Sequence, residues 1–96
     1  MSPEKFKKLE KLRKKLDKID NSLLKIIKKR SDIVRKVLQL KSFKKEIVDK
    51  KRINIILKNI RKKSIASNID PKVTNKIWIN MIKAYIDFEK RNFKKK

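Results

Sequence analysis

The sequence predicts an all-α fold of three helices, one very long, one short and one of medium length, within a single domain over residues 1–96. The 96 residues include no Gly and only two Pro, so the turn residues that sheets and tight hairpins need are missing. Along the first 40 residues, apolar side chains recur at alternating spacings of three and four, which is typical of a long helix packed against other helices. A chain of this length provides only a modest core if it folds alone.

The very long helix is predicted from Ser2 to about Lys41. Ser2 suits the N-cap, Pro3 the first helical position, and Glu4 the positive end of the helix dipole. The apolar series omits one step, at position 30, where Arg30 stands. The series comprises Leu9, Leu12, Leu16, Ile19, Leu23, Ile26, Ile33, Val37 and Leu40.

The length of this helix predicts a homodimer. About 40 residues at about 1.5 Å each extend to about 60 Å. A compact domain of this size is only about 30 Å across. The apolar seam therefore needs a partner, and the simplest partner is the same helix in a second copy.

Two shorter helices are predicted after a loop over residues 42–48. Asp49 is a plausible N-cap for a helix that ends near Ser64, and Asp70 followed by Pro71 starts another that ends near Phe93. Residues 94–96 are expected to be a frayed tail. The apolar stripe of the second helix is Ile53, Ile56, Leu57 and Ile60, and that of the third is Ile77, Trp78, Met81, Ile82, Tyr85 and Phe88.

The charge balance favours anionic ligands. The chain has 32 Lys and Arg against 10 Asp and Glu, a net charge of +22, which attracts polyanions. Abundant Ile, Asn and Lys also fit AT-rich coding, so a basic helical protein that binds nucleic acid remains an alternative. Only six of these cations are Arg.

Absent residue types exclude several kinds of chemistry. Without Cys or His there are no disulfides, thiol nucleophiles, Cys/His metal sites or histidine acid–base catalysis. The acids are scattered, so we expect no carboxylate metal site. The N-terminal residues lack an apolar leader and no run approaches a membrane span, so we expect a soluble, cytoplasmic protein.

Arg30 and Lys41 are predicted to share one helical face, since eleven residues make about three turns and about 16 Å. They can frame a small cavity with a cation at each end. The alternative is that both side chains run along apolar surface with their heads in water. No acid near Arg30 is an obvious partner, and a buried unpaired arginine is costly, which favours a bound anion.

Three further residues are candidates for the same site. Arg13 lies seventeen residues before Arg30, about 25 Å away along the helix axis, so one ligand can contact both only if Arg13 comes from an antiparallel second copy. Glu89 extends the third apolar stripe; it is either a surface glutamate or a partly buried carboxyl that donates a hydrogen bond when protonated. Arg52 is either a solvated cation or part of the site.

The order and spacing of these residues resemble the all-α chorismate mutases over nearly the whole chain. The matching pieces are residues 12–30, Lys41, the Asp-x-x-Arg of residues 49–52, and residues 68–89. No single piece is specific, but the ordered set is. The resemblance implies an intertwined helical homodimer that converts chorismate to prephenate, toward phenylalanine and tyrosine, without a metal or cofactor.

The resemblance also implies roles. Arg13 of the other subunit and Arg30 are expected to bind the two carboxylates of chorismate, where arginine forks fit best. Lys41 and Glu89 are expected at the ether oxygen, and Arg52 contributes charge and orientation. Asp49, Ile53 and Tyr85 complete the expected substrate-binding set.

Three departures from the family pattern leave the substrate open. Ile53 stands where glutamate commonly binds the substrate hydroxyl, Glu89 stands where glutamine is frequent, and the interval from Lys41 to Arg52 is one residue short. The short interval, Ile53 and Tyr85-Ile86 resemble the isochorismate-pyruvate lyases, which share the fold and form salicylate and pyruvate. Lyase activity is therefore the alternative enzyme function.

Overall fold

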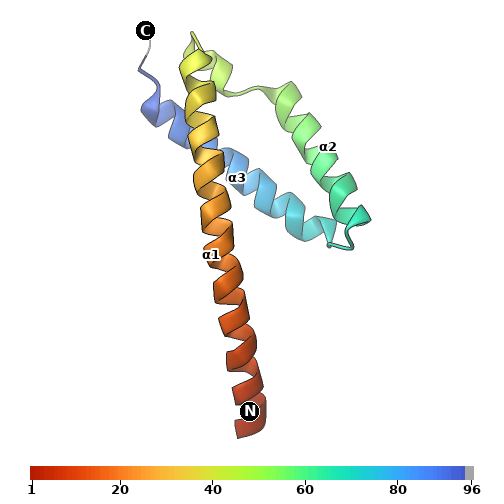
Figure 1. The fold of residues 1–96 in the computed structure, drawn as a ribbon. Helices are drawn as coiled ribbons and strands as arrows, with labels where there is room; N and C mark the ends of the chain where they lie inside the picture. Colours follow the sequence, from red (N-terminus) through yellow and green to blue (C-terminus); the bar gives the residue numbers. More distant parts are fainter. Residues whose placement is uncertain (95–96) are drawn as a thin grey trace. The chain divides into compact units, whose positions relative to one another are not determined.

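The computed structural model describes residues 1–94 and is all-helical over them, which confirms the predicted class (Figure 1). It contains three α-helices and one short 3₁₀ helix: α1 (Pro3–Leu40), η1 (Lys44–Ile47), α2 (Lys50–Ala66) and α3 (Pro71–Asn92). Of the predicted frayed tail, residues 95–96 lie outside the described residues, and Lys94 follows α3 without regular structure. Within residues 1–94, no helix has both the length and the apolar character needed to cross a membrane.

The chain divides into two units, residues 1–33 and 34–96. The first unit is helical from Pro3 onward. Its predicted start is confirmed, because Ser2 Oγ accepts a hydrogen bond from the Lys5 N–H at 3.3 Å and the Ser2 carbonyl accepts from the Phe6 N–H at 2.9 Å. Its large apolar side chains are about half exposed, including Phe6, Leu12, Leu16, Ile19, Leu23 and Ile26. The first unit therefore leaves its apolar seam uncovered.

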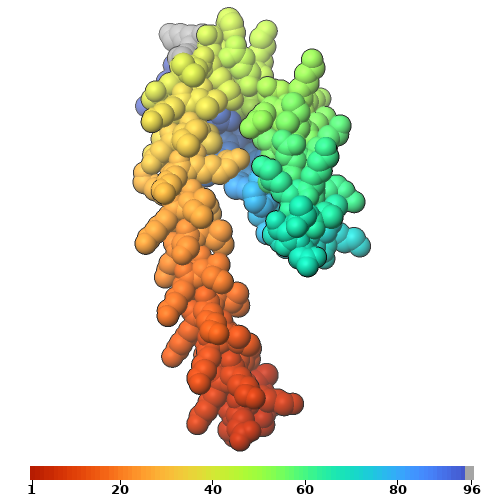
Figure 2. All heavy atoms as spheres, turned by 45° about the vertical axis from the view of Figure 1, so that its right-hand side comes forward, coloured from red at the N-terminus to blue at the C-terminus, as the bar shows by residue number. Residues whose placement is uncertain are grey.

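The second unit is built around the helical hairpin of α2 and α3. The two helices run antiparallel (Figure 1), and their side chains meet in the space-filling view (Figure 2). The predicted apolar stripe of α2 is half-buried throughout. On α3 the predicted stripe is half-buried except at Ile77, which is 51% exposed.

Local hydrogen bonds set the ends of the two hairpin helices. Asp49 caps α2 by accepting from the Arg52 N–H at 3.0 Å, and Asp70 caps α3 by accepting from the Lys72 N–H at 2.9 Å. Both caps are as predicted. The predicted end of this helix near Ser64 is wrong by two residues, since α2 continues to Ala66.

The end of α2 is a Schellman motif built on asparagine. Asn68 has φ 60°, the left-handed conformation that glycine usually supplies. The Ile69 N–H donates to the Ser64 carbonyl at 2.8 Å, and the Asn68 N–H donates to the Ile65 carbonyl at 3.2 Å. In a chain without glycine, asparagine is the residue that tolerates this conformation best.

A buried pair of hydroxyl groups ties α2 to α3. Ser64 Oγ lies 2.7 Å from Thr74 Oγ1 and 2.6 Å from the Ile60 carbonyl oxygen. The two residues are 3% and 8% exposed. Because buried hydroxyls need partners, this pair fixes where the two helices meet.

The predicted loop over residues 42–48 contains the short helix η1. Its Ile47 is 4% exposed, and the helix packs against α3. The Ser42 N–H donates to Glu46 Oε2 at 2.9 Å, which holds the chain immediately after α1. This turn places Lys41 beside α3.

Candidate active site

A buried ion pair joins the end of α1 to α3. Lys41 Nζ lies 3.1 Å from Glu89 Oε1, and the two side chains are 19% and 8% exposed. Lys41 follows the last turn of α1, where its N–H still donates to the Leu38 carbonyl at 3.1 Å. Two residues that the sequence predicts for one site, 48 positions apart, are therefore in direct contact.

Tyr85 lies one helical turn before Glu89, on the same side of α3. It is half-buried, and its ring meets the Phe88 ring edge to face, with centroids 6.4 Å apart. The side chain is therefore fixed beside the Lys41–Glu89 pair by packing against its own helix.

Asp49, Arg52 and Ile53 lie together in the first turn of α2. The Asp49 carboxylate is engaged as the helix cap, the Arg52 side chain is exposed, and Ile53 is half-buried on the core side. Within residues 1–94, neither Asp49 nor Arg52 has a side-chain hydrogen bond or ion pair to Lys41 or Glu89. The isolated chain therefore does not join this group to the buried pair.

Arg13 and Arg30 belong to the first unit. Arg13 Nη1 pairs with Glu10 Oε1 at 2.8 Å, with the side chains 58% and 42% exposed. Arg30 is only partly buried, and it has an interaction partner. Arg30 is therefore not a buried arginine without a partner, although Ser31, Asp32 and Val34 beside it are half-buried too. Its assignment to a substrate carboxylate depends on the resemblance alone.

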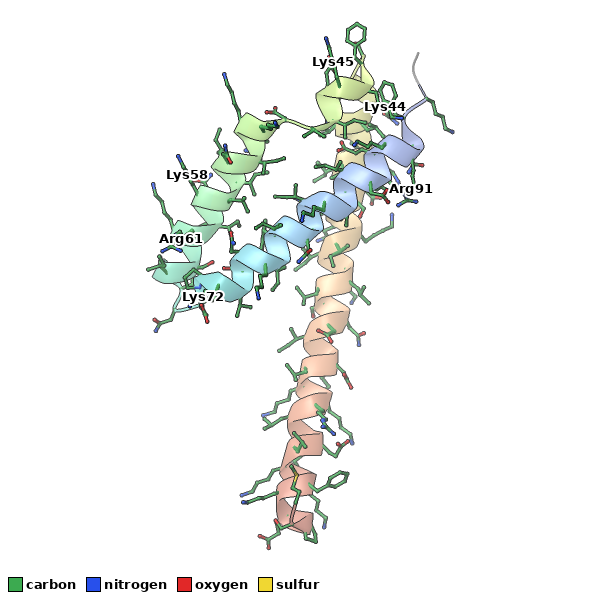
Figure 3. The ribbon with its side chains drawn as sticks, turned by 180° about the vertical axis from the view of Figure 1, so that it is seen from behind. Lys44, Lys45, Lys58, Arg61, Lys72 and Arg91 are labelled. Carbon is green, nitrogen blue, oxygen red and sulfur yellow. The ribbon has the colours of Figure 1, made fainter. Side chains whose placement is uncertain are left out.

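The site residues can bind an anion but do not form a metal centre. Among residues 1–94, no group of three or more acidic residues could hold a metal ion. The surrounding charge is strongly positive, since α2 carries seven basic residues and no acid. Lys58 and Arg61 of that helix (Figure 3) line a small pocket together with Pro71 and Asn75 of α3, so they add to the field rather than to the buried pair.

The contact between Lys41 and Glu89 was not predicted from the sequence, which indicates two separate groups that each face a ligand. One signal could have indicated the contact: Lys41 and Glu89 have opposite charges, and each follows the last residue of an apolar stripe. The contact of Arg35 was not predicted either; its guanidinium carbon lies 5.5 Å from the centroid of the Phe88 ring. Both contacts depend on how the end of α1 packs against α3.

The buried Lys–Glu pair and the basic surface make this small helical protein suited to an anionic ligand. A profile of the chorismate mutase type II family matches residues 12–90. A chorismate mutase of Methanocaldococcus jannaschii is 35% identical over 74 residues, which cover 76% of this chain and 75% of that protein. No solved structure matches the chain significantly. The chain belongs to the chorismate mutase type II family.

Family membership confirms the predicted resemblance and assigns the chain chorismate mutase activity, an isomerisation. The matched segment, residues 12–90, contains every residue named for the site, from Arg13 to Glu89. The comparisons favour neither isochorismate-pyruvate lyase activity nor nucleic-acid binding as the main function.

Proposed function

We propose that two copies of this chain pair through α1 and form two equivalent sites, each of which binds chorismate and rearranges it to prephenate. The Lys41–Glu89 pair is the observation that carries this proposal. The two side chains lie 3.1 Å apart and are largely buried, so they provide a preorganised polar pair.

Arginine side chains are proposed to bind the two carboxylates of chorismate. Arg30 and Arg13 of the second copy clamp one carboxylate each or share them, since the planar guanidinium fits a carboxylate with two parallel hydrogen bonds. Holding both carboxylates selects the compact conformer in which the bond-forming carbons are close. This restriction lowers the entropic part of the barrier.

Lys41 and Glu89 are proposed to stabilise the ether oxygen, which gains negative charge as the C–O bond breaks. The Lys41 ammonium can donate to that oxygen directly. Glu89 can donate only when it is protonated, so in this role its carboxyl must hold a proton while substrate is bound. Donors aimed at the developing charge lower the transition state more than the bound substrate, which is the condition for rate acceleration.

The proposed roles of the remaining residues follow from their places on α2 and α3. Arg52, exposed at the start of α2, supplies charge and orientation. Asp49 and Ile53 flank it and contact the substrate ring, and Tyr85 forms the wall one turn from Glu89. In place of the glutamate that is common after Arg52, half-buried Ile53 leaves hydroxyl recognition to the neighbouring groups.

The exposed seam of α1 supports the dimer. Side chains that alternate at spacings of three and four are 48–58% exposed from Leu12 to Ile26. Burying one such side chain stabilises by roughly 1.5–3 kcal/mol, so covering the whole seam is strongly favourable. A second copy supplies a seam of the same pattern, which satisfies both chains at once.

The activity test is a direct assay of chorismate loss and prephenate formation by the purified chain, without added metal. We expect turnover of chorismate and, in a parallel assay, little or none of isochorismate. No turnover of chorismate would reject the proposed function, and faster turnover of isochorismate would move the assignment to the lyase reaction.

A mixing experiment tests whether the sites are shared. Arg13→Ala and Lys41→Ala chains should each be inactive alone. After they are unfolded and refolded together at equal amounts, half of the dimers are mixed, and one of the two sites in each mixed dimer is intact. About a quarter of wild-type activity should return, as random pairing of two chains requires. No recovery, with mixed dimers present by mass spectrometry, would contradict a shared site.

Three further properties stay predictions. The sequence predicts a single domain over residues 1–96 and a cytoplasmic location, and the resemblance implies a place in phenylalanine and tyrosine biosynthesis.

A further inference from the structure

A small cavity lies between the middle of α2 and the first turns of α3, within the unit of residues 34–96. Its volume is about 200 Å³, and it is lined by Leu57, Lys58, Arg61, Pro71 and Asn75. None of these residues has a role in the proposed chorismate site. The cavity is therefore a separate candidate for binding.

Two cations in its wall lie close together on α2 without an anionic partner. Lys58 and Arg61 are three residues apart, so they are neighbours on the helix surface. Both residues are exposed, and within residues 1–94 neither side chain takes part in an ion pair or a hydrogen bond. Like charges that are neighbours on a helix repel each other, and an anion bound by both removes that repulsion.

The surroundings of the cavity favour an anion over a cation. The lining contains two cations, one amide and apolar carbon atoms, but no acid. Asp70 precedes Pro71 of the lining, but its carboxylate caps α3 by accepting from the Lys72 N–H at 2.9 Å. The helix that supplies both cations carries seven basic residues and no acid, so its field attracts anions.

We infer that this cavity binds a phosphate group, either free phosphate or the phosphate of a small molecule. A phosphate monoester carries a charge of about −1.5 to −2 at pH 7, which engages both cations, whereas a carboxylate carries a single charge. The Arg61 guanidinium offers a planar set of donors to the phosphate oxygens, and the Lys58 ammonium adds a compact charge.

The remaining lining residues fit the same ligand. The side-chain amide of Asn75 has no hydrogen bond within residues 1–94, so it can donate to another phosphate oxygen. Leu57 and Pro71 are half-buried and offer apolar surface to the rest of a phosphorylated molecule. A cavity of about 200 Å³ is smaller than the roughly 300–1,000 Å³ of sites for drug-sized ligands, which suits a small anion.

The test titrates the full chain with sodium phosphate at constant ionic strength and follows the side-chain amide signals of Asn75 by NMR. We expect saturable shifts that sodium chloride does not produce. Lys58→Gln and Arg61→Gln should each weaken binding by about tenfold, the usual effect of losing a hydrogen bond to a charged group. Both residues are exposed, so neither change should disturb folding.

The matched control is Lys51→Gln. Lys51 is exposed on the same helix, seven residues before Lys58 and about 10 Å away along the axis, so its charge is largely screened from the cavity. This variant should bind phosphate as the wild type does. Unchanged affinity in both Lys58→Gln and Arg61→Gln would overturn the inference, and so would equal shifts with chloride, since the site would then not select phosphate.

Two further measurements identify the ligand and the site. Tighter binding of phenyl phosphate than of inorganic phosphate would support a phosphorylated small molecule, whereas equal affinities would support free phosphate. In Lys41→Met the shifts of Asn75 should persist with similar affinity. If this variant abolishes them, the probe occupies the chorismate site and the inference is rejected. Because activity is not the readout, a failure of the proposed function leaves this result interpretable.

Discussion

Replacing Lys41 by methionine tests the buried pair most directly, because methionine keeps the length and apolar stem of lysine and removes only its charge. In the structure Lys41 Nζ lies 3.1 Å from Glu89 Oε1, with the side chains 19% and 8% exposed. Lys41→Met therefore leaves a largely buried carboxylate without its cation. We expect two separate losses, one in stability and one in catalysis.

The loss of stability can be estimated from the geometry. Two unit charges 3.1 Å apart attract by about 5 kcal/mol at an effective dielectric constant of about 20, and desolvation of both groups offsets much of this. Hydrogen bonds to charged groups are worth about 1.5–3 kcal/mol net. Since Lys41 retains some contact with water, we expect the free energy of unfolding to fall by about 2 kcal/mol.

Urea unfolding at fixed protein concentration measures this loss, since the stability of the proposed dimer would depend on concentration. A double-mutant cycle with Glu89→Gln isolates the interaction, and we expect a coupling energy of about 1 kcal/mol or more. The matched control is Lys28→Met, which breaks an exposed pair with Asp32 at 2.7 Å where the side chains are 70% and 45% exposed. That exposed pair should contribute less than about 0.5 kcal/mol.

Catalysis is the second loss and has its own outcome. Removing one preorganised donor should lower kcat/KM for chorismate by about 100- to 1000-fold. Near-normal kcat/KM in Lys41→Met would remove this residue from the mechanism even if stability falls. Zero coupling with Glu89→Gln would instead refute the ion pair itself, because independent residues give additive changes.

Three further predictions use other parts of the chain. Arg30→Ala should lower kcat/KM by about 100-fold or more while sedimentation still shows a dimer, and unimpaired turnover would reject its carboxylate role. If Glu89 donates a hydrogen bond to the ether oxygen, Glu89→Gln should keep kcat/KM near the wild-type value, because the amide group is also a donor; a loss of about 100-fold or more would remove Glu89 from that role. Asn68→Ala should lower the free energy of unfolding by about 1 kcal/mol, because φ 60° is unfavourable for a residue that has a Cβ but no compensating polar group. Asn68→Gly should change the free energy of unfolding by less than about 0.5 kcal/mol, and thermal or urea unfolding measures both variants.

The helix starts could be predicted from the sequence because their signals are local. Ser2, Asp49 and Asp70 each cap a helix through a hydrogen bond to a residue two or three positions ahead. The end of α2 was harder, since a left-handed asparagine signals it less strongly than glycine does. The short helix η1 was missed because its apolar Ile47 is buried by α3, which is distant in sequence.

The site could be predicted as a set of residues but not as a set of contacts. Charge and spacing identified Lys41 and Glu89 separately, yet their contact depends on the packing of two helices 48 residues apart. The interaction partner of Arg30 was missed for a related reason, because the sequence alone does not show how exposed α1 is around it. Periodicity gives the face of a helix, whereas a contact needs the position of the neighbouring element as well.

The division of the site residues between the two units has a consequence for the enzyme. Arg13 and Arg30, proposed for the carboxylates, lie in residues 1–33, whereas Lys41 and Glu89, proposed for the ether oxygen, lie in residues 34–96. The first unit also carries the exposed apolar seam proposed for the dimer. In the proposed dimer, association and carboxylate binding use the same stretch of α1, so a change that separates the two copies would also remove Arg13 from the site. Dilution below the dissociation constant of the dimer should accordingly abolish turnover, although the Lys41–Glu89 pair lies within a single chain.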